Sequence, residues 1–172
     1  MTALVVAGPA GSGKSTLGRE LARRTRAVLL DLDTITNPLL EVLHPGSGTG
    51  SPSHWNSPEL RPLVRPARYA ALLALAREQV ALRHDVVLVA PFTAELAGGP
   101  EWTELRAALA PVEPTVLWLE VPADVLAARV RERGEDRDAF WTASPPTPPA
   151  VPHRALDATL APDELADLVM GG

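Results

Sequence analysis

The chain has 172 residues, a formal net charge of -5, 46% apolar and 22% charged residues, and no cysteine. This length suits one domain, 1–172, with a sizeable core. The missing cysteine excludes disulfides, thiolate zinc sites and a cysteine nucleophile. The acidic balance disfavours nucleic acid and acidic membranes as partners, and no apolar run is long enough for a transmembrane helix. We expect a cytoplasmic protein without a signal peptide, as a monomer or homodimer.

Short apolar runs alternate with segments of helical spacing, which is typical of a parallel sheet covered by helices on both faces. The predicted strands cover residues 2–7, 27–33, 85–90 and 115–121, with a short fifth strand at 153–159. The predicted helices cover residues 15–24, 36–43, 66–83, 99–110, 122–134 and 161–170. Gly, Ser and Pro dominate residues 44–58, which predicts a loop. The sequence therefore predicts an α/β fold with a mainly parallel five-stranded sheet.

The first strand runs into "GPAGSGKST", in which Gly8, Gly13, Lys14 and Ser15 satisfy G-x-x-x-x-G-K-[ST]. Glycines let successive backbone N–H groups point into one concavity, and the following helix N-terminus adds positive charge there. Lys14 is the only lysine of the chain; its compact ammonium can reach β and γ phosphates, and the Ser15 hydroxyl suits Mg²⁺. The predicted phosphate-binding residues are Gly8, Ala10, Gly11, Ser12, Gly13, Lys14, Ser15 and Thr16.

This loop, between an apolar strand and an amphipathic helix, resembles that of the P-loop NTPases. Within them the chain is similar to small-molecule kinases such as shikimate kinase, gluconate kinase, chloramphenicol phosphotransferase and AAA-type small ATP-binding proteins. The resemblance follows the element order over most of the chain, although only the loop is highly specific. It implies a three-layer α/β/α P-loop kinase fold, ATP and Mg²⁺ as cofactors, a helical acceptor-binding insert at 34–84 and an arginine-bearing lid at 129–150.

Two aspartates end the second predicted strand. In an extended chain Asp31 and Asp33 point to the same face, at the carboxyl edge of the sheet beside the glycine-rich loop. The resemblance implies that Asp31 helps to hold Mg²⁺ or its water shell and that Asp33 orients or deprotonates the acceptor hydroxyl. The alternative is that both are solvated and cap the next helix, which suits Asp33 in particular.

The third predicted strand ends in Ala90, Pro91 and Phe92, without the acidic residue that motor ATPases and GTPases usually carry there. With a single lysine, the chain also has no guanine-reading N-K-x-D beyond the loop. Both observations disfavour GTPases and motors, and both suit the shikimate- and gluconate-kinase-like group.

Arginines recur four residues apart after the fourth predicted strand, where this group carries its lid. Arg129 and Arg133 share one helical face. The resemblance implies that they close over ATP and stabilise the charge of the transferred phosphoryl group. A solvated charged face is the alternative. By position in the fold, His153 and Arg154 are candidates for stacking on the adenine base.

The long insert and the end of the third strand supply the candidate acceptor contacts. The alternatives are surface exposure for the arginines, loop anchoring for Trp55 and core packing for Phe92. Besides Asp33, the candidates are His54, Trp55, Arg65, Arg68, Phe92 and Thr93.

Together these features predict an ATP- and Mg²⁺-dependent phosphotransferase that acts on a hydroxyl group of a small molecule, with Lys14, Asp33, Arg129 and Arg133 as its catalytic residues. A nucleoside or nucleotide kinase, in which the insert grips a second base and phosphate, is one alternative. A nucleotide-binding regulatory module without transfer activity is another, and a toxin-like kinase resembling zeta toxins shares the same loop.

Overall fold

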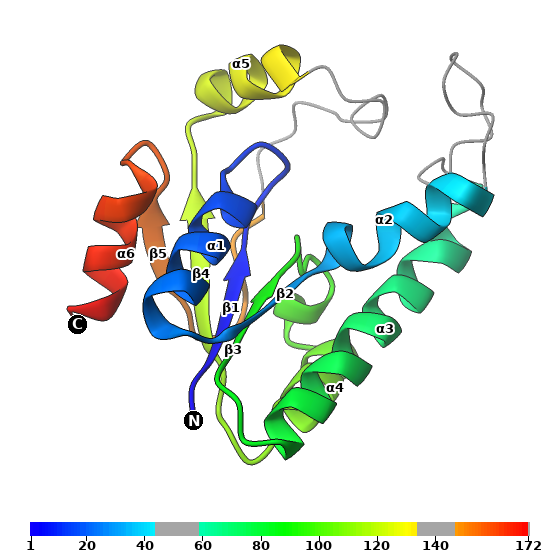
Figure 1. Ribbon diagram of the computed structural model, residues 1–172. Coiled ribbons are helices and arrows are strands. Elements are labelled where there is room, and N and C mark those ends of the chain that lie inside the picture. Colours follow the sequence, from blue (N-terminus) through cyan, green and yellow to red (C-terminus); the bar gives the residue numbers. More distant parts are fainter. Residues whose placement is uncertain (44–58, 134–146, 172) are drawn as a thin grey trace.

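One sheet of five strands, paired in parallel in the order β2-β3-β1-β4-β5, forms the centre of the molecule (Figure 1). The computed structural model describes residues 1–43, 59–133 and 147–171. Its strands are β1 (Ala3–Ala7), β2 (Val28–Asp31), β3 (Val86–Val89), β4 (Thr115–Glu120) and β5 (Arg154–Asp157). Its helices are α1 (Lys14–Thr25), α2 (Leu32–Leu43), α3 (Arg61–Ala81), α4 (Pro100–Leu109), α5 (Ala123–Arg133) and α6 (Pro162–Met170), with a short 3-10 helix η1 (Glu95–Ala97).

Helices cover both faces of the sheet because alternate residues of each strand point to opposite sides. Val5 of β1 is fully buried in the core that α3 and α4 share with the sheet. Its neighbour Val6 is fully buried in the core formed with α1, α5 and α6. The predicted three-layer α/β/α fold with a five-stranded sheet is therefore confirmed, and every described strand pair is parallel.

The end of β2 differs from the sequence prediction. The strand stops at Asp31, and α2 begins at Leu32, so that Asp33 lies in the first turn of a helix. The backbone N–H groups of Asp33 and Thr34 donate to Asp31 Oδ1 at 3.0 and 3.2 Å. The expectation of an extended Asp-x-Asp pair is thus wrong, because Asp31 uses one carboxylate oxygen to cap α2. Pro38 lies inside this helix, which is longer than the predicted 36–43.

The long helix α3 also begins earlier than the predicted residue 66. It starts at Arg61, with Pro62 in its first turn, where a missing N–H costs no helical hydrogen bond. Pro66 lies inside the helix. The extra turns carry Arg61 and Arg65 onto the same helix as Arg68.

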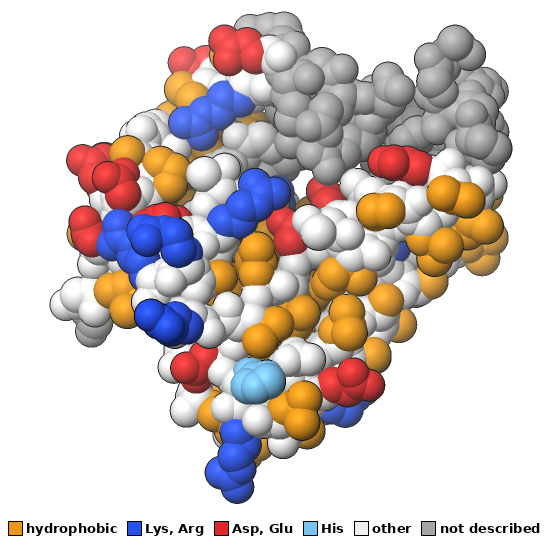
Figure 2. Space-filling model, viewed as in Figure 1, with side chains coloured by type: hydrophobic (Ala, Val, Ile, Leu, Met, Phe, Trp, Pro, Cys, Tyr) orange, Lys and Arg blue, Asp and Glu red, His pale blue; other side chains and the backbone are white. Residues whose placement is uncertain are grey.

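The outer surface of α2 and the start of α3 is rich in apolar side chains (Figure 2). Exposed members of this set are Leu39, Val42, Leu43 and Leu63. Within the described ranges, none of the helices has both the length and the apolar character needed to cross a membrane.

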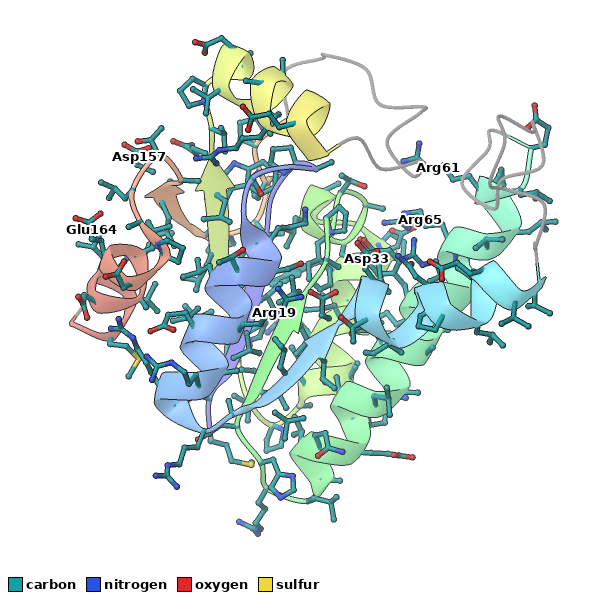
Figure 3. All side chains as sticks on the ribbon, turned by 45° about the horizontal axis from the view of Figure 1, so that its top comes forward. Arg19, Asp33, Arg61, Arg65, Asp157 and Glu164 are labelled. Atoms are coloured by element: carbon teal, nitrogen blue, oxygen red, sulfur yellow. The ribbon has the colours of Figure 1, made fainter. Side chains whose placement is uncertain are left out.

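Side chains from three helices converge near the carboxyl ends of the strands. Arg19 on α1, Asp33 on α2 and Arg65 on α3 all lie around this edge (Figure 3). In open parallel sheets this edge is where ligands bind.

Helix α1 approaches the sheet closely at Gly18. A Cβ built on this residue would lie 2.3 Å from Val89 Cγ2 of β3, closer than two carbon atoms can pack. Glycine is thus required here by contact with the sheet, although it is a poor helix former.

We expect Gly18→Ala to destabilise the protein by about 1–3 kcal/mol, because the overpacking cost exceeds the gain of about 1 kcal/mol in helix propensity. Urea unfolding monitored by circular dichroism gives the difference directly. Val89→Ala in the same background should recover part of the loss, and the Val89→Ala single variant completes the double-mutant cycle. A more stable Gly18→Ala protein would contradict the close approach of α1 to β3.

Candidate active site

The glycine-rich loop leaves β1 at Gly8 and enters α1 at Lys14. Gly8 has φ +150°, and a Cβ there would lie 2.9 Å from Ser12 Oγ and 3.1 Å from Leu119 Cβ. Gly13, which precedes α1, has φ +90°, in the region that favours glycine. Both residues therefore fit the tight turn that wraps the backbone around the helix N-terminus. Lys14 Nζ donates to the carbonyl of Pro9 at 2.9 Å, which holds its ammonium over the loop.

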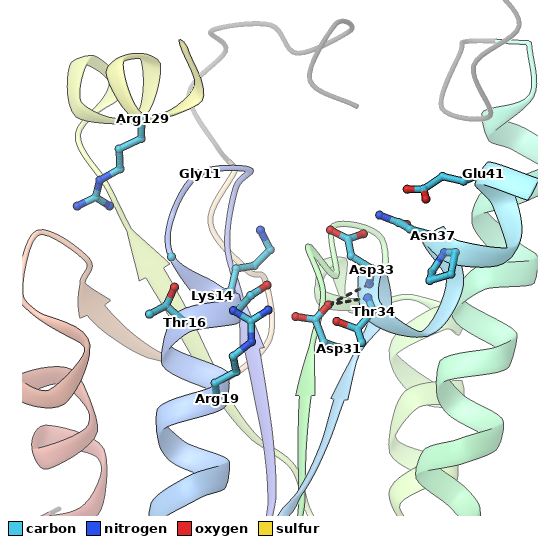
Figure 4. A pocket seen from close by; sticks show the side chains of 13 residues that line it. Gly11, Lys14, Thr16, Arg19, Asp31, Asp33, Thr34, Asn37, Glu41 and Arg129 are labelled. Atoms are coloured by element: carbon cyan, nitrogen blue, oxygen red, sulfur yellow. Dashed lines mark hydrogen bonds between the residues drawn. The ribbon is translucent and has the colours of Figure 1, made fainter. Parts of the chain in front are cut away.

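A cavity of about 640 Å³ opens between this loop, α1 and α2 (Figure 4). It brings together most of the predicted phosphate-binding residues, both aspartates and one predicted lid arginine. Its lining residues are Gly11, Gly13, Lys14, Ser15, Thr16, Arg19, Asp31, Asp33, Thr34, Asn37, Pro38, Glu41 and Arg129. Gly8, Ala10 and Ser12 complete the loop but do not line this cavity.

Asp31 is a suitable carboxylate for a divalent cation. Its side chain is 5% exposed, and while Oδ1 caps α2, the buried Oδ2 has no hydrogen-bond partner among the described residues. An ionised oxygen that is buried and unpartnered is costly unless a cation or a donor satisfies it. The Ser15 hydroxyl lines the same cavity. Within the described part of the chain no cluster of three or more His, Cys, Asp or Glu side chains could hold a metal. The donor set thus fits Mg²⁺, which is usually bound by one or two protein oxygens together with substrate phosphates.

Asp33 faces two cavities, the one beside the loop and a smaller one of about 120 Å³ between α2, α3 and the end of β3. Arg68 Nη2 donates to Asp33 Oδ1 at 2.6 Å. The same guanidinium donates to Thr36 Oγ1 at 2.8 Å and to Asn37 Oδ1 at 2.9 Å. Arg68 therefore ties α2 to α3 and fixes the orientation of the Asp33 carboxylate.

Arg65 pairs with Glu95, a residue that the sequence analysis did not single out. Arg65 Nη2 lies 2.7 and 3.0 Å from the two carboxylate oxygens of Glu95, whose side chain is 3% exposed. Burial raises the pKa of Glu95, and the positive charge of Arg65 only partly offsets this effect. The guanidinium also stacks on the Tyr69 ring, with Cζ 4.2 Å from the ring centroid.

The turn after β3 is held by this same cluster. Phe92 has φ +50°, a strained conformation for a residue with a Cβ, and its N–H donates to Tyr69 Oη at 3.0 Å. The two rings meet edge to face at 5.8 Å. Burial raises the pKa of Tyr69 to about 12, so its hydroxyl remains protonated at neutral pH. Phe92 is fully buried, which agrees with the core-packing alternative. It also lines an apolar cavity of about 430 Å³. Thr93 lines both this cavity and the smaller one beside α3.

Of the predicted lid residues, Arg129 lines the large cavity, and its Nη2 donates to the carbonyl of Ala158 at 3.0 Å. The side chain of Arg133 lies outside the described part of the structure, as do His54, Trp55 and most of the predicted lid at 129–150. Their assignments stay predictions.

The structure does not bring His153 and Arg154 to the large cavity. Arg154 opens β5, and its Nη2 donates to the carbonyl of Leu168 at the end of α6. His153 Nδ1 lies 2.9 Å from the carbonyl of Val151. Arg154 is thus directed toward α6, and the adenine-stacking role of these two residues stays a prediction.

Sequence reasoning missed Arg19, Asn37 and Glu41 in the cavity wall. Arg19 follows Ser15 by four residues on α1, so helical spacing alone could have placed it on the same face. Asn37 and Glu41 follow Asp33 at the same spacing, but the predicted helix began only at residue 36. The sequence therefore provided no reason to place Asp33 on one helical face with them, whereas α2 in fact begins at Leu32.

The glycine turn that carries Lys14 lies at the carboxyl end of the central strand. The described sheet is all-parallel, with the order 2-3-1-4-5. These features define a P-loop protein with the three-layer fold of P-loop kinases. The family model described as an AAA domain matches residues 4–161, and the chain belongs to this family.

Solved kinases share this fold over nearly the whole chain. A candidate kinase from Chloroflexus aurantiacus superposes with a TM-score of 0.70 at 19% identity, covering 99% of this chain and 97% of the other. A gluconokinase from Sinorhizobium meliloti gives 0.61 at 20% identity, covering 99% and 90%. Shikimate kinase from Aquifex aeolicus gives 0.58 at 15% identity, covering 98% and 94%. No curated protein matches the sequence significantly.

The raised pKa of the buried Glu95 carboxyl predicts how the free energy of unfolding depends on pH. Because its folded pKa lies above the ordinary 4.5, its contribution to the free energy of unfolding is fully present below that pH and is lost as pH rises through the raised value. We expect the wild type to become less stable relative to Glu95→Gln as pH increases. Urea unfolding at a series of pH values measures it. If the wild type instead gained stability relative to the variant, the charge of Arg65 would outweigh the effect of burial on the pKa of Glu95.

Proposed function

We propose that this protein transfers the γ-phosphoryl group of ATP to a hydroxyl group of a small molecule. The observation that supports this proposal best is the single cavity lined by Lys14, Ser15, Asp31, Asp33 and Arg129. A phosphate-binding loop needs only the first two of these for nucleotide binding. The additional carboxylates and the arginine are the groups that phosphoryl transfer requires.

The loop residues hold the donor. Backbone N–H groups between Gly8 and Ser15 and the N-terminus of α1 surround the phosphates, and the Lys14 ammonium neutralises the β/γ end. Ser15 and the unpartnered oxygen of Asp31 would hold Mg²⁺, which supplies further neutralisation of the phosphates when bound.

Asp33 acts on the acceptor. Its carboxylate faces both the phosphate cavity and the smaller cavity beside α3, so a hydroxyl bound there would meet it next to the donor. Asp33 then orients the hydroxyl and accepts its proton as the oxygen attacks phosphorus. Arg129, and in the same helix Arg133, stabilise the charge that spreads over the transferred group. Catalysis is therefore mainly positioning and charge neutralisation.

Lys14→Ala should lower kcat/KM by on the order of 10²–10³-fold or more, because the phosphates lose their one ammonium contact. Acceptor-dependent ADP release by the purified protein, screened over neutral and charged alcohols, measures this. Unchanged activity in Lys14→Ala would contradict the phosphate assignment of the loop.

Asp33→Asn should reduce acceptor-dependent ADP release by on the order of 10²–10⁴-fold while ATP affinity is retained, since Asn keeps the shape but cannot accept the proton. Calorimetric titration with a non-hydrolysable ATP analogue checks the second part. Full turnover by Asp33→Asn would exclude its role as base. ATP binding without phosphorylated product from any metabolite extract would favour the regulatory module instead.

A further inference from the structure

The acceptor side of the site is built around two arginines that already have carboxylate partners. The small cavity beside α3 is lined by Leu32, Asp33, Arg61, Val64, Arg65, Arg68, Tyr69, Pro91 and Thr93. Two of its three arginines are half-buried, and the third, Arg61, is exposed in the first turn of α3, farther from Asp33 in the view of Figure 3.

Arg65 is compensated by a carboxylate that solvent does not reach. Both oxygens of Glu95 lie within 3.0 Å of one Arg65 nitrogen, and the aromatic ring of Tyr69 covers the guanidinium face. An anionic ligand at Arg65 would either displace Glu95, leaving a buried charge unpaired, or add a second negative charge beside it. Both outcomes are costly in a partly buried site.

Arg68 is compensated in the same way. Its donors are directed to Asp33, Thr36 and Asn37 at 2.6–2.9 Å, and its side chain is only 13% exposed. Asp33 is the carboxylate that the acceptor hydroxyl must approach. A carboxylate or phosphate on the acceptor would bring a further negative charge beside Asp33, in addition to the γ-phosphate of ATP, and would be repelled.

Among the described residues, the neighbouring cavity is lined without a charged side chain. Thr93 connects the arginine-lined cavity to a second one of about 430 Å³ that reaches the outer side of the phosphate loop at Gly8 and Pro9. Its lining among the described residues is Gly8, Pro9, Phe92, Thr93, Leu96, Ala97, Trp118, Leu126, Thr147, Pro148, Pro149 and Ala150, without an acidic or basic side chain. Arg61, which is hydrated and screened, adds little attraction for an anion.

We propose that the acceptor is an uncharged alcohol, with an apolar part that occupies the cavity beside Phe92 and Trp118, rather than a carboxylate- or phosphate-bearing metabolite. This inference rests on the proposed kinase function, because it concerns the molecule whose hydroxyl meets Asp33. Arg65 and Arg68 shape the pocket and orient carboxylates of the protein itself. They are positioning residues for Asp33 and for the turn after β3.

The charge of the pocket can be tested without the true acceptor. The protein is first saturated with a non-hydrolysable ATP analogue and Mg²⁺, so that the phosphate loop is filled. Sulfate and gluconate are then titrated while the side-chain Nε–Hε signals of Arg65 and Arg68 are followed by NMR. We expect no saturable anion binding at these two arginines in the wild type. Glu95→Gln, which removes the partner of Arg65, should raise anion affinity there about tenfold or more.

Glu113→Gln is the matched control. Glu113 pairs with Arg106 at 2.9 Å, with both side chains exposed and away from the site, so its loss should leave anion affinity at Arg65 and Arg68 unchanged. Saturable binding of sulfate or gluconate at either arginine in the wild type would overturn the inference, whether or not Glu95→Gln folds. An unchanged affinity in folded Glu95→Gln would overturn it too. Failure of the proposed function is seen separately, as an absence of ATP-analogue binding or of ADP release, while the arginine signals still report the state of the two ion pairs.

Discussion

The tight turn of the backbone between Gly8 and Gly13 is the constraint on which the rest of the site depends. Contacts with Ser12 and Leu119 leave no room for a side chain at Gly8, and left-handed conformations recur along the loop. The turn places Lys14 as the first residue of α1, at the positive end of the helix dipole and at the carboxyl edge of the central strand. Phosphate binding is thus a property of backbone geometry first and of one ammonium second.

Strand β2, at the edge of the sheet, couples the fold to the chemistry through a single carboxylate. Asp31 ends β2, and one of its oxygens receives the first N–H groups of α2. That capping fixes the direction in which α2 leaves the sheet and therefore where Asp33 lies. It also leaves the second oxygen buried in the cavity wall, where only a cation or a donor can satisfy it. The same residue therefore stabilises the helix with one oxygen and offers the other to the cavity.

Features that depend on local chemistry could be predicted from the sequence. The loop, the buried strands and the layer order follow from short motifs and apolar runs, because these patterns have few alternative structures. The start of α2 was missed because Asp31 capping competes with strand extension, and only the folded sheet decides between them. The pairing of Arg65 with Glu95 spans 30 residues and has no local signal. The contact of Arg154 with α6 has no local signal either, because position along the chain says little about which face of β5 its side chain occupies.

The partners of the arginines explain how one cleft can treat two ligands differently. Arg129 donates to the carbonyl of Ala158, a neutral group, and so keeps its full positive charge beside the phosphate cavity. Arg65 and Arg68 donate to carboxylates, which cancel their charge on the acceptor side. Because ion pairs in partly buried sites are weakly screened, this difference distinguishes the two cavities that Asp33 lines. Under the proposed function, a polyphosphate would therefore be attracted to one side of Asp33, whereas the other side would offer shape, hydrogen bonds and apolar surface to a molecule without charge.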